Sequence, residues 1–303
     1  NNKVLWMFGD TIFSPASVDG TNLRTNTAAL ADFNNPYEVS EPVDANGAPY
    51  QFIPFSNVQQ TYNDNATNKS HDRYIIWPDR ALNIDADSAY VFYKNIKATP
   101  TTGDNYSLVN LGTGVAQVEA NSTTATRVMD ILFSGTEDRY VPEMIHGDYV
   151  YAFHCVNGFL VGDCSVARTL KANILVRSSY EFWDNDSSIW QSDIEQATHH
   201  IVGSTSSMSV IYSQYLKKYL MLGAGAFSHE LYMRTADNPE GPWSDREIFY
   251  DDGDQIYGGR IHEELSTNNG QTIPLTLSSS SGMKIVALTF DPSNKGSGPF
   301  TLT

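Results

Sequence analysis

The stretch Glu230-Leu-Tyr-Met-Arg-Thr-Ala-Asp-Asn-Pro-Glu-Gly-Pro-Trp243 decides the fold, because a strand-like run passes directly into a tight turn. Around it, short aromatic and aliphatic runs alternate with a Gly-Ala-Gly turn, a Pro-Glu-Gly-Pro turn and polar breaks. The runs cover residues 206–212, 218–222, 231–234 and 247–250. Four antiparallel strands in succession are typical of one blade of a β-propeller.

Similar units recur along the 303 residues at a spacing of about 60 to 70 residues, so five blades fit the length best. No linker divides the chain, and convincing amphipathic helical windows are absent. We therefore predict an all-β fold, a five-bladed β-propeller with four-stranded antiparallel blades, as a single domain over residues 1–303. We also expect residues 298–302 to pair with the first strand, residues 3–8, because a partner there removes an open edge.

The charge balance excludes several classes of partner. The chain has 35 acidic and 19 basic residues, a formal net charge of −16. Nucleic acids and anionic membranes require clustered Lys and Arg, which this sequence lacks. The longest apolar runs are far shorter than the roughly 20 residues of a membrane helix. We expect a soluble monomer.

Two features indicate an oxidising compartment. Cys155 and Cys164 flank Asn157-Gly158 in a strand, turn and strand pattern, which favours a disulfide over two free thiols. Five Asn-X-Ser/Thr sequons in polar stretches are candidate glycosylation sites. They lie at Asn65, Asn68, Asn105, Asn121 and Asn185. We therefore predict a secreted, extracellular glycoprotein.

Several segments together resemble a secreted family of five-bladed propellers that is catalogued as of unknown function. The segments are Leu5-Trp-Met-Phe-Gly-Asp-Thr11, Asn26-Thr-Ala28, Trp77-Pro-Asp79, Thr235-Ala-Asp-Asn-Pro-Glu-Gly-Pro-Trp243 and Tyr257-Gly-Gly-Arg-Ile-His-Glu-Glu264. Characterised bacterial members of that family include endo-D-arabinanases. The resemblance implies a carbohydrate-active propeller whose glycan is arabinan or another polysaccharide.

The first two blades supply the first candidate site residues. Asp10 follows an apolar strand and a glycine, where a carboxylate faces a cleft or caps a turn. Asp79 precedes Arg80, whose guanidinium favours the ionised carboxylate of a base or nucleophile, although a structural pair fits equally well. Trp77 either offers its flat face to a sugar ring or is buried within a blade. We add Asn26 and Arg80 as substrate contacts.

The fifth blade is dense in polar side chains. If residues 260–264 form an inner strand, alternation sends Arg260 and His262 to one face and Glu263 to the other. We predict His262 and Glu263 as catalytic residues, and Arg260 and Tyr257 as substrate contacts.

Metal and cofactor sites lack support in the sequence. His199 and His200 are adjacent, so on a strand they point to opposite faces, and no third ligand has a convincing spacing. We predict no catalytic metal and no cofactor, and we expect His200 to contact substrate. A structural calcium ion held by backbone carbonyls leaves no trace in a sequence, so that alternative stays open.

These residues favour a glycoside hydrolase that cleaves a polysaccharide with a carboxylate pair on the propeller axis. Asp10 and Asp79 form the first pair, and Glu263 is the third carboxyl and candidate acid. One alternative is a polysaccharide lyase, with His262 or Tyr257 as base and Arg260 neutralising a uronate. Another is a carbohydrate-binding propeller without catalysis, which the absence of a motif common to every blade disfavours.

Overall fold

The computed structural model describes residues 3–67, 71–103, 105–137, 140–156, 163–198, 202–203, 207–224, 228–291 and 300–302. The chain divides into two compact units. The first comprises residues 1–141 and 175–177, and the second residues 142–174 and 178–303. That residues 1–303 form a single domain stays a prediction.

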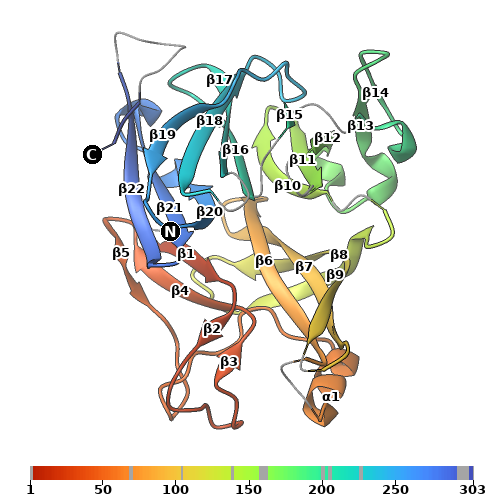
Figure 1. Cartoon of the computed structure of the whole chain (residues 1–303), viewed down its shortest axis with the longest axis vertical. Helices are drawn as coiled ribbons and strands as arrows, with labels where there is room; N and C mark the ends of the chain where they lie inside the picture. The colour runs from red at the N-terminus through yellow and green to blue at the C-terminus, as the bar shows by residue number, and fades with distance from the viewer. Residues whose placement is uncertain are drawn as a thin grey trace. The chain divides into compact units, whose positions relative to one another are not determined.

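Among the described residues, five antiparallel sheets of three or more strands follow one another along the chain (Figure 1). They are the blades of a five-bladed β-propeller, which confirms the predicted fold class. Three sheets have four strands in sequential order, whereas the first sheet has three strands and the third has six. Sequential order lets short turns connect neighbouring strands, as the closely spaced turn signals in the sequence require.

The first sheet belongs to the first unit and has the order β1-β4-β5. Its strands are β1 (Lys3–Phe8), β4 (Thr27–Asp32) and β5 (Asn35–Ser40). Between β1 and β4 the chain forms a small hairpin from β2 (Thr11–Ile12) and β3 (Leu23–Arg24). The loop that begins after β1 therefore returns to the sheet through its own strand pair.

The second sheet also lies in the first unit and has the longest strands of the part that the structure describes (Figure 1). They are β6 (Arg73–Asn83), β7 (Ser88–Pro100), β8 (Tyr106–Glu119) and β9 (Ala125–Ser134). Most residues in the centre of β7 are buried, and Lys94 is the exposed exception, so both faces of this strand are largely covered.

One α-helix, α1 (Asn57–Asn65), precedes β6 and contacts it. Its first turn is closed by a capping box, in which Ser56 and Gln59 each bond the other's backbone N–H. Gln59 is the helix's one buried residue, so α1 has no apolar stripe.

The third sheet is assigned to the second unit, apart from its first residue, Val141. Its strands are β10 (Val141–His146), β11 (Tyr149–Val156), β12 (Asp163–Leu170), β13 (Glu181–Asp184), β14 (Ile189–Gln191) and β15 (Val202–Gly203). Cys155 and Cys164 are directly opposite in the β11–β12 pair and form a disulfide, so that prediction is confirmed.

The fourth and fifth sheets complete the second unit. The fourth contains β16 (Ser207–Ser213), β17 (Lys218–Ala224), β18 (Glu230–Ala236) and β19 (Glu247–Asp251), which confirms the four predicted runs. The fifth contains β20 (Ile256–Ile261), β21 (Thr272–Ser279), β22 (Gly282–Phe290) and β23 (Phe300–Leu302). Short 3-10 helices occupy Lys171–Asn173, Arg177–Ser179, Ile194–Gln196, Glu263–Leu265 and Asn268–Gly270.

The facing sides of the fourth and fifth sheets form one hydrophobic cluster. Leu222 and Leu231 from the fourth sheet and Leu275 from the fifth are fully buried in it. Each completely buried leucine contributes roughly 2 kcal/mol relative to an exposed one. Side chains alternating along these strands thus hold adjacent blades together.

The prediction for the C-terminal strand is wrong. β23 pairs with β22, and β1 pairs with β4, so residues 300–302 extend the fifth sheet and not the first. Pairing with β22 keeps β23 on the sheet that the preceding part of the chain has just formed.

Candidate functional site

Asp10 lies in the bend that follows β1, and its side chain is exposed. Trp77 in β6 donates its indole Nε1–H to Asp10 Oδ1 at 2.9 Å. The indole is partly buried against Ile75, Ile96 and Ala98, which fixes the direction of its N–H. One carboxylate oxygen of Asp10 is therefore held in place by a side chain 67 positions away in the sequence.

Asp79 sits in a β-bulge. Pro78 pairs with Tyr93 and Arg80 pairs with Phe92, so Asp79 is the extra residue between them. A bulge bends its strand and redirects side chains, and bulges are frequent beside active sites. The Asp79 carboxylate meets Lys94 Nζ at 3.0 Å, with 12% of the Asp79 side chain and 46% of the Lys94 side chain exposed.

These two contacts, related by the register of β6 and β7, define one group of residues, the Asp10–Asp79 cluster, made of Asp10, Trp77, Asp79 and Lys94. Trp77 and Lys94 are directly opposite in the β6–β7 register, so their side chains share one face of the sheet. Three of the four residues were predicted from the sequence, and Lys94 was not. The ion pair seen at Asp79 involves Lys94, whereas the sequence had suggested Arg80.

Asn26 forms hydrogen bonds to backbone and side-chain groups next to this cluster. Its Nδ2 donates to the Ile76 carbonyl at 3.0 Å and to Thr25 Oγ1 at 3.3 Å, and its Oδ1 accepts from Ile53 N at 2.6 Å. The residue has 0% exposure. A side chain so enclosed fixes the backbone beside Trp77, which does not favour the predicted contact with substrate.

Two threonines support the turn that carries Asp10. Thr11 Oγ1 donates to the Gly9 carbonyl at 3.1 Å and lies 3.1 Å from Thr27 Oγ1. The turn is therefore tied to the first residue of β4.

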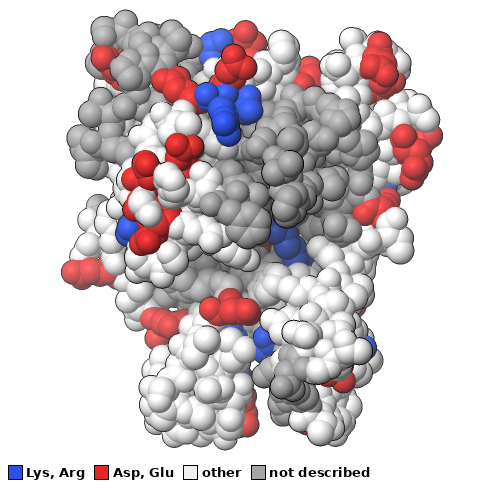
Figure 2. Space-filling model, in the orientation of Figure 1, with Lys and Arg blue, Asp and Glu red and all other residues white. Residues whose placement is uncertain are grey.

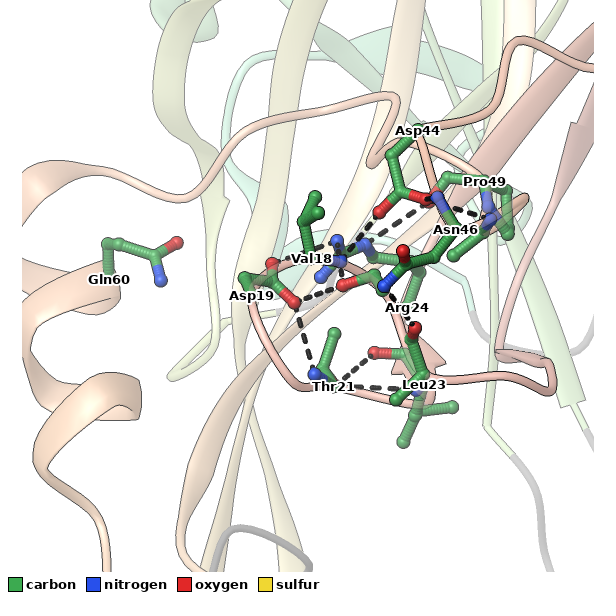
Figure 3. A network of polar contacts seen from close by, with 12 residues as sticks. Val18, Asp19, Thr21, Leu23, Arg24, Asp44, Asn46, Pro49 and Gln60 are labelled. Carbon is green, nitrogen blue, oxygen red and sulfur yellow. Dashed lines mark hydrogen bonds and ion pairs between the residues drawn. The ribbon is translucent and has the colours of Figure 1, made fainter.

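The loop between β2 and β3 is held by a polar network (Figure 3). Arg24 pairs with Asp19 at 2.9 Å, donates to Ser17 Oγ at 3.1 Å and donates to the Pro49 carbonyl at 3.3 Å. Partial burial raises the pKa of Asp19, but hydrogen bonds from Ser17, Thr21 and Arg24 outweigh it and hold the pKa below its usual value.

Asp44 joins the loop at residue 18 to the segment around residue 46. Its carboxylate accepts hydrogen bonds from the backbone N–H groups of Val18, Asn46 and Ala48 at 2.8 to 3.0 Å (Figure 3). These bonds lower the pKa of Asp44, led by the one from Val18. An ion pair and several hydrogen bonds thus hold the loop that follows Asp10 in place.

The second unit contains a buried ion pair that the sequence did not reveal. Arg260 Nη1 donates to Glu143 Oε2 at 3.1 Å and to Oε1 at 3.4 Å. Only 5% of the Glu143 side chain is exposed, against 28% of that of Arg260. A buried carboxylate is costly without a partner, so Arg260 stabilises its charge. Glu143 lies within the apolar run of β10, where no charge pattern marks it.

The predicted strand over residues 260–264 is wrong beyond Ile261. β20 ends there, and His262 precedes a 3-10 helix that starts at Glu263. The backbone N–H of His262 bonds the Pro274 carbonyl at 3.0 Å, but its φ and ψ of −109° and 73° leave the strand conformation. Alternation therefore does not assign a face to Glu263, whose side chain is exposed.

Both ring nitrogens of His262 have partners. Nδ1 lies 3.0 Å from Glu264 Oε1, and Nε2 lies 3.0 Å from Thr276 Oγ1. Tyr257 is 81% exposed and occupies a bulge at the beginning of β20, whereas Arg260 lies near its end. The separation along the strand is roughly 10 Å. These two predicted site residues are therefore not brought together.

His200 and Asn68 lie outside the described residues. The other sequon asparagines are exposed, as a glycan would require, and glycosylation stays a prediction; they are Asn65, Asn105, Asn121 and Asn185. In the described part of the chain, no group of three or more His, Cys, Asp and Glu side chains is arranged to hold a metal ion.

On the face in Figure 2, Asp and Glu side chains are dispersed, and Lys and Arg form small separate groups. No helix within the described ranges has the length and apolar character needed to cross a membrane. The disulfide is compatible with an extracellular protein.

A family model described as "Domain of unknown function (DUF4185)" matches residues 1–288. The chain belongs to the DUF4185 family. This confirms the resemblance seen in the sequence, since the matched region includes all five resembling segments. No curated protein matches the chain.

Several solved structures share the fold of this DUF4185 protein. An endo-arabinase from Bacteroides thetaiotaomicron has a TM-score of 0.52 and 13% identity, over 88% of this chain and 86% of that one. A levansucrase from Gluconacetobacter diazotrophicus has a TM-score of 0.54 and 8% identity, over 100% and 80%. An exo-β-1,3-galactanase from Phanerochaete chrysosporium with galactose has a TM-score of 0.50 and 8% identity, over 100% and 64%. At these identities the likeness establishes the fold alone.

Proposed function

We propose that this protein is a secreted glycoside hydrolase that cleaves a polysaccharide, with Asp10 and Asp79 as its carboxylate pair. The observation that carries the proposal is the Asp10–Asp79 cluster. It combines two carboxylates, each bonded to a nitrogen donor, with a partly exposed indole. Carboxylates and an aromatic face are the groups that glycosidic cleavage and sugar binding require.

The contacts assign roles within the pair. In hydrolysis, the glycosidic C–O bond breaks and a water O–H is split between the two products, so one group must take a proton or attack, and another must protonate the leaving oxygen. A hydrogen bond to the charged form, or a nearby cation, favours an ionised carboxylate. Asp79, which pairs with Lys94, therefore suits the base, nucleophile or charge-stabilising role; Asp10 supplies the second carboxylate of the pair, and the sequence predicts a third carboxyl as the acid.

The sequence predicts Glu263 as the acid, and the second unit also contains Glu143. Glu263, the residue predicted from the sequence, is exposed and so accessible to a leaving group. Glu143 is buried and paired with Arg260, which favours its ionised form and disfavours proton donation. Glu263 belongs to the second unit, and its role as the acid stays a prediction from the sequence.

The neighbouring structures support a glycan as the substrate. The names endo-arabinase and exo-β-1,3-galactanase indicate polymers of arabinose and of galactose as the substrates of those proteins. Arabinan and β-1,3-galactan are therefore the first substrates to test. The lyase alternative is less well supported. Glu143 already neutralises Arg260, and both nitrogens of His262 have partners, which removes the free cation and free base that a lyase would need.

The test combines product analysis with one variant. Incubation with arabinan, β-1,3-galactan and uronate-containing polysaccharides should yield fragments whose masses include an added water. Asp10→Asn keeps an oxygen that accepts from Trp77 but removes the charge, so we expect kcat/KM to fall by about 100- to 10,000-fold with the fold intact. Asp87→Asn, at an exposed aspartate of the same unit, is the matched control. Near wild-type activity of Asp10→Asn would remove Asp10 from the mechanism, and unsaturated products would indicate a lyase.

A further inference from the structure

Lys94 is the member of the Asp10–Asp79 cluster that no sequence motif marks. It lies on β7, directly opposite Trp77, and its ammonium group reaches diagonally to Asp79. We propose that Lys94 is a positioning residue that keeps Asp79 ionised and oriented, so that Asp79 serves as the base or nucleophile. This inference rests on the proposed hydrolase function and adds a residue to its site.

Burial explains why Asp79 needs a cation. Only 12% of its side chain is exposed, and a largely buried carboxylate is unstable as an anion unless it is paired. Lys94 is suited to the task because 46% of its own side chain is exposed, so its charge remains partly hydrated. The desolvation cost therefore falls mainly on Asp79, and the ion pair compensates it.

The β-bulge explains why Asp79 and Lys94 meet. Asp79 is the extra residue of the bulge in β6, so one additional side chain is placed at this position of the β6–β7 pair. Trp77 and Lys94 occupy a neighbouring register position, and the 3.0 Å ion pair brings Asp79 to their face of the sheet. Loss of Lys94 would remove this contact from the bulged carboxylate.

Two further charged residues belong to the same unit as Asp79 and Lys94. Asp10, bonded to Trp77, contributes negative charge from the end of β1, and Arg80 follows Asp79 in β6. The net effect of Lys94 is measurable only by removing its charge and leaving Asp10 and Arg80 in place.

The experiment follows the titration of Asp79 directly. The intact protein is labelled with 13C at aspartate carboxyl groups, and the Asp79 signal is assigned from its disappearance in Asp79→Asn. In Lys94→Met we expect the midpoint of the Asp79 titration to rise by about 1 pH unit, since an opposite charge at this distance shifts a carboxyl by 1 to 3 units and partial exposure weakens the effect. Lys94→Arg should restore most of the shift.

Lys97→Met is the matched control, because Lys97 lies on the same strand but stacks over Tyr62 and Tyr74 at 4.3 and 5.4 Å. It should leave the Asp79 midpoint unchanged. In wild-type protein, 1 M salt should move the midpoint toward that of Lys94→Met, since the pair is partly exposed. An unchanged midpoint in Lys94→Met, with a folded protein by circular dichroism, would overturn the inference.

Activity supplies the second readout. If Asp79 must be ionised, the acidic limb of the kcat/KM profile of Lys94→Met should move to higher pH by the same amount as the titration. A shifted titration with an unshifted limb would refute the role of Asp79 as base or nucleophile. If the wild-type protein cleaves no glycan, the proposed hydrolase function fails, whereas the titration still decides whether Lys94 controls Asp79.

Discussion

Replacement of Asn26 by alanine should destabilise the protein without affecting substrate binding. The substitution removes three side-chain hydrogen bonds, and it leaves the Ile53 N–H and the Ile76 carbonyl without these partners. Both isoleucines are fully buried, with exposures of 0%. An unsatisfied buried group costs about 1 to 3 kcal/mol, and a carbonyl keeps a second lone pair, so we expect a loss of about 2 to 4 kcal/mol.

Urea unfolding followed by tryptophan fluorescence and circular dichroism measures this loss. The midpoint for Asn26→Ala should fall by about 1 to 2 M urea. Asn22→Ala, at an exposed position just before β3, should lie within about 0.5 kcal/mol of the wild type. An unchanged midpoint for Asn26→Ala together with an increased KM would refute the structural role and support the substrate contact predicted from the sequence.

Two further predictions concern stability. Replacing Cys155 and Cys164 by alanine should lower the free energy of unfolding by about 3 kcal/mol, because the disulfide closes a short loop in the unfolded chain. Urea midpoints measured with and without reductant test this, and equal midpoints would contradict it. Partial burial raises the pKa of Glu137, but hydrogen bonds from Arg177 and Ser134 outweigh it, so the folded pKa lies below its ordinary 4.5. This stabilisation is present above pH 4.5 and is lost as the pH falls through the folded pKa. Arg177→Met should therefore cost about 1 kcal/mol at pH 7 and less at pH 3, and an equal cost at both pH values would exclude the ion pair as its source.

The strands that the sequence predicted well have alternating side chains between strong turn signals. The run 247–250 differs from β19 (Glu247–Asp251) by one residue. β10 was missed because its first four residues are all buried, which removes alternation, and because it contains Pro142. α1 was missed because a helix with one buried residue has no apolar period. Period-based reasoning fails where burial is complete or nearly absent.

Some residues of the candidate site were recognisable from the sequence, and others were not. Asp10, Trp77 and Asp79 were recognisable because each adjoins a glycine or a proline in the sequence, although β6 continues through Pro78. Lys94 and Glu143 were not, because each lies inside a strand, where a charge has no distinctive local context. Glu263 was assigned to a strand that ends two residues earlier.

The sequence by itself determined the local properties of this protein. The strand periods and turn positions gave the fold class, and the cysteine pair and the acidic balance were also visible. Only the tertiary structure decided which polar side chains meet. The bond between Trp77 and Asp10 spans 67 positions and that between Arg260 and Glu143 spans 117. Such contacts depend on strand register, and the ion pair of Asp79 with Lys94 depends in addition on the bulge in β6. A shift of one residue reverses the face of every side chain in a strand, and that choice is made by the packing of the whole sheet.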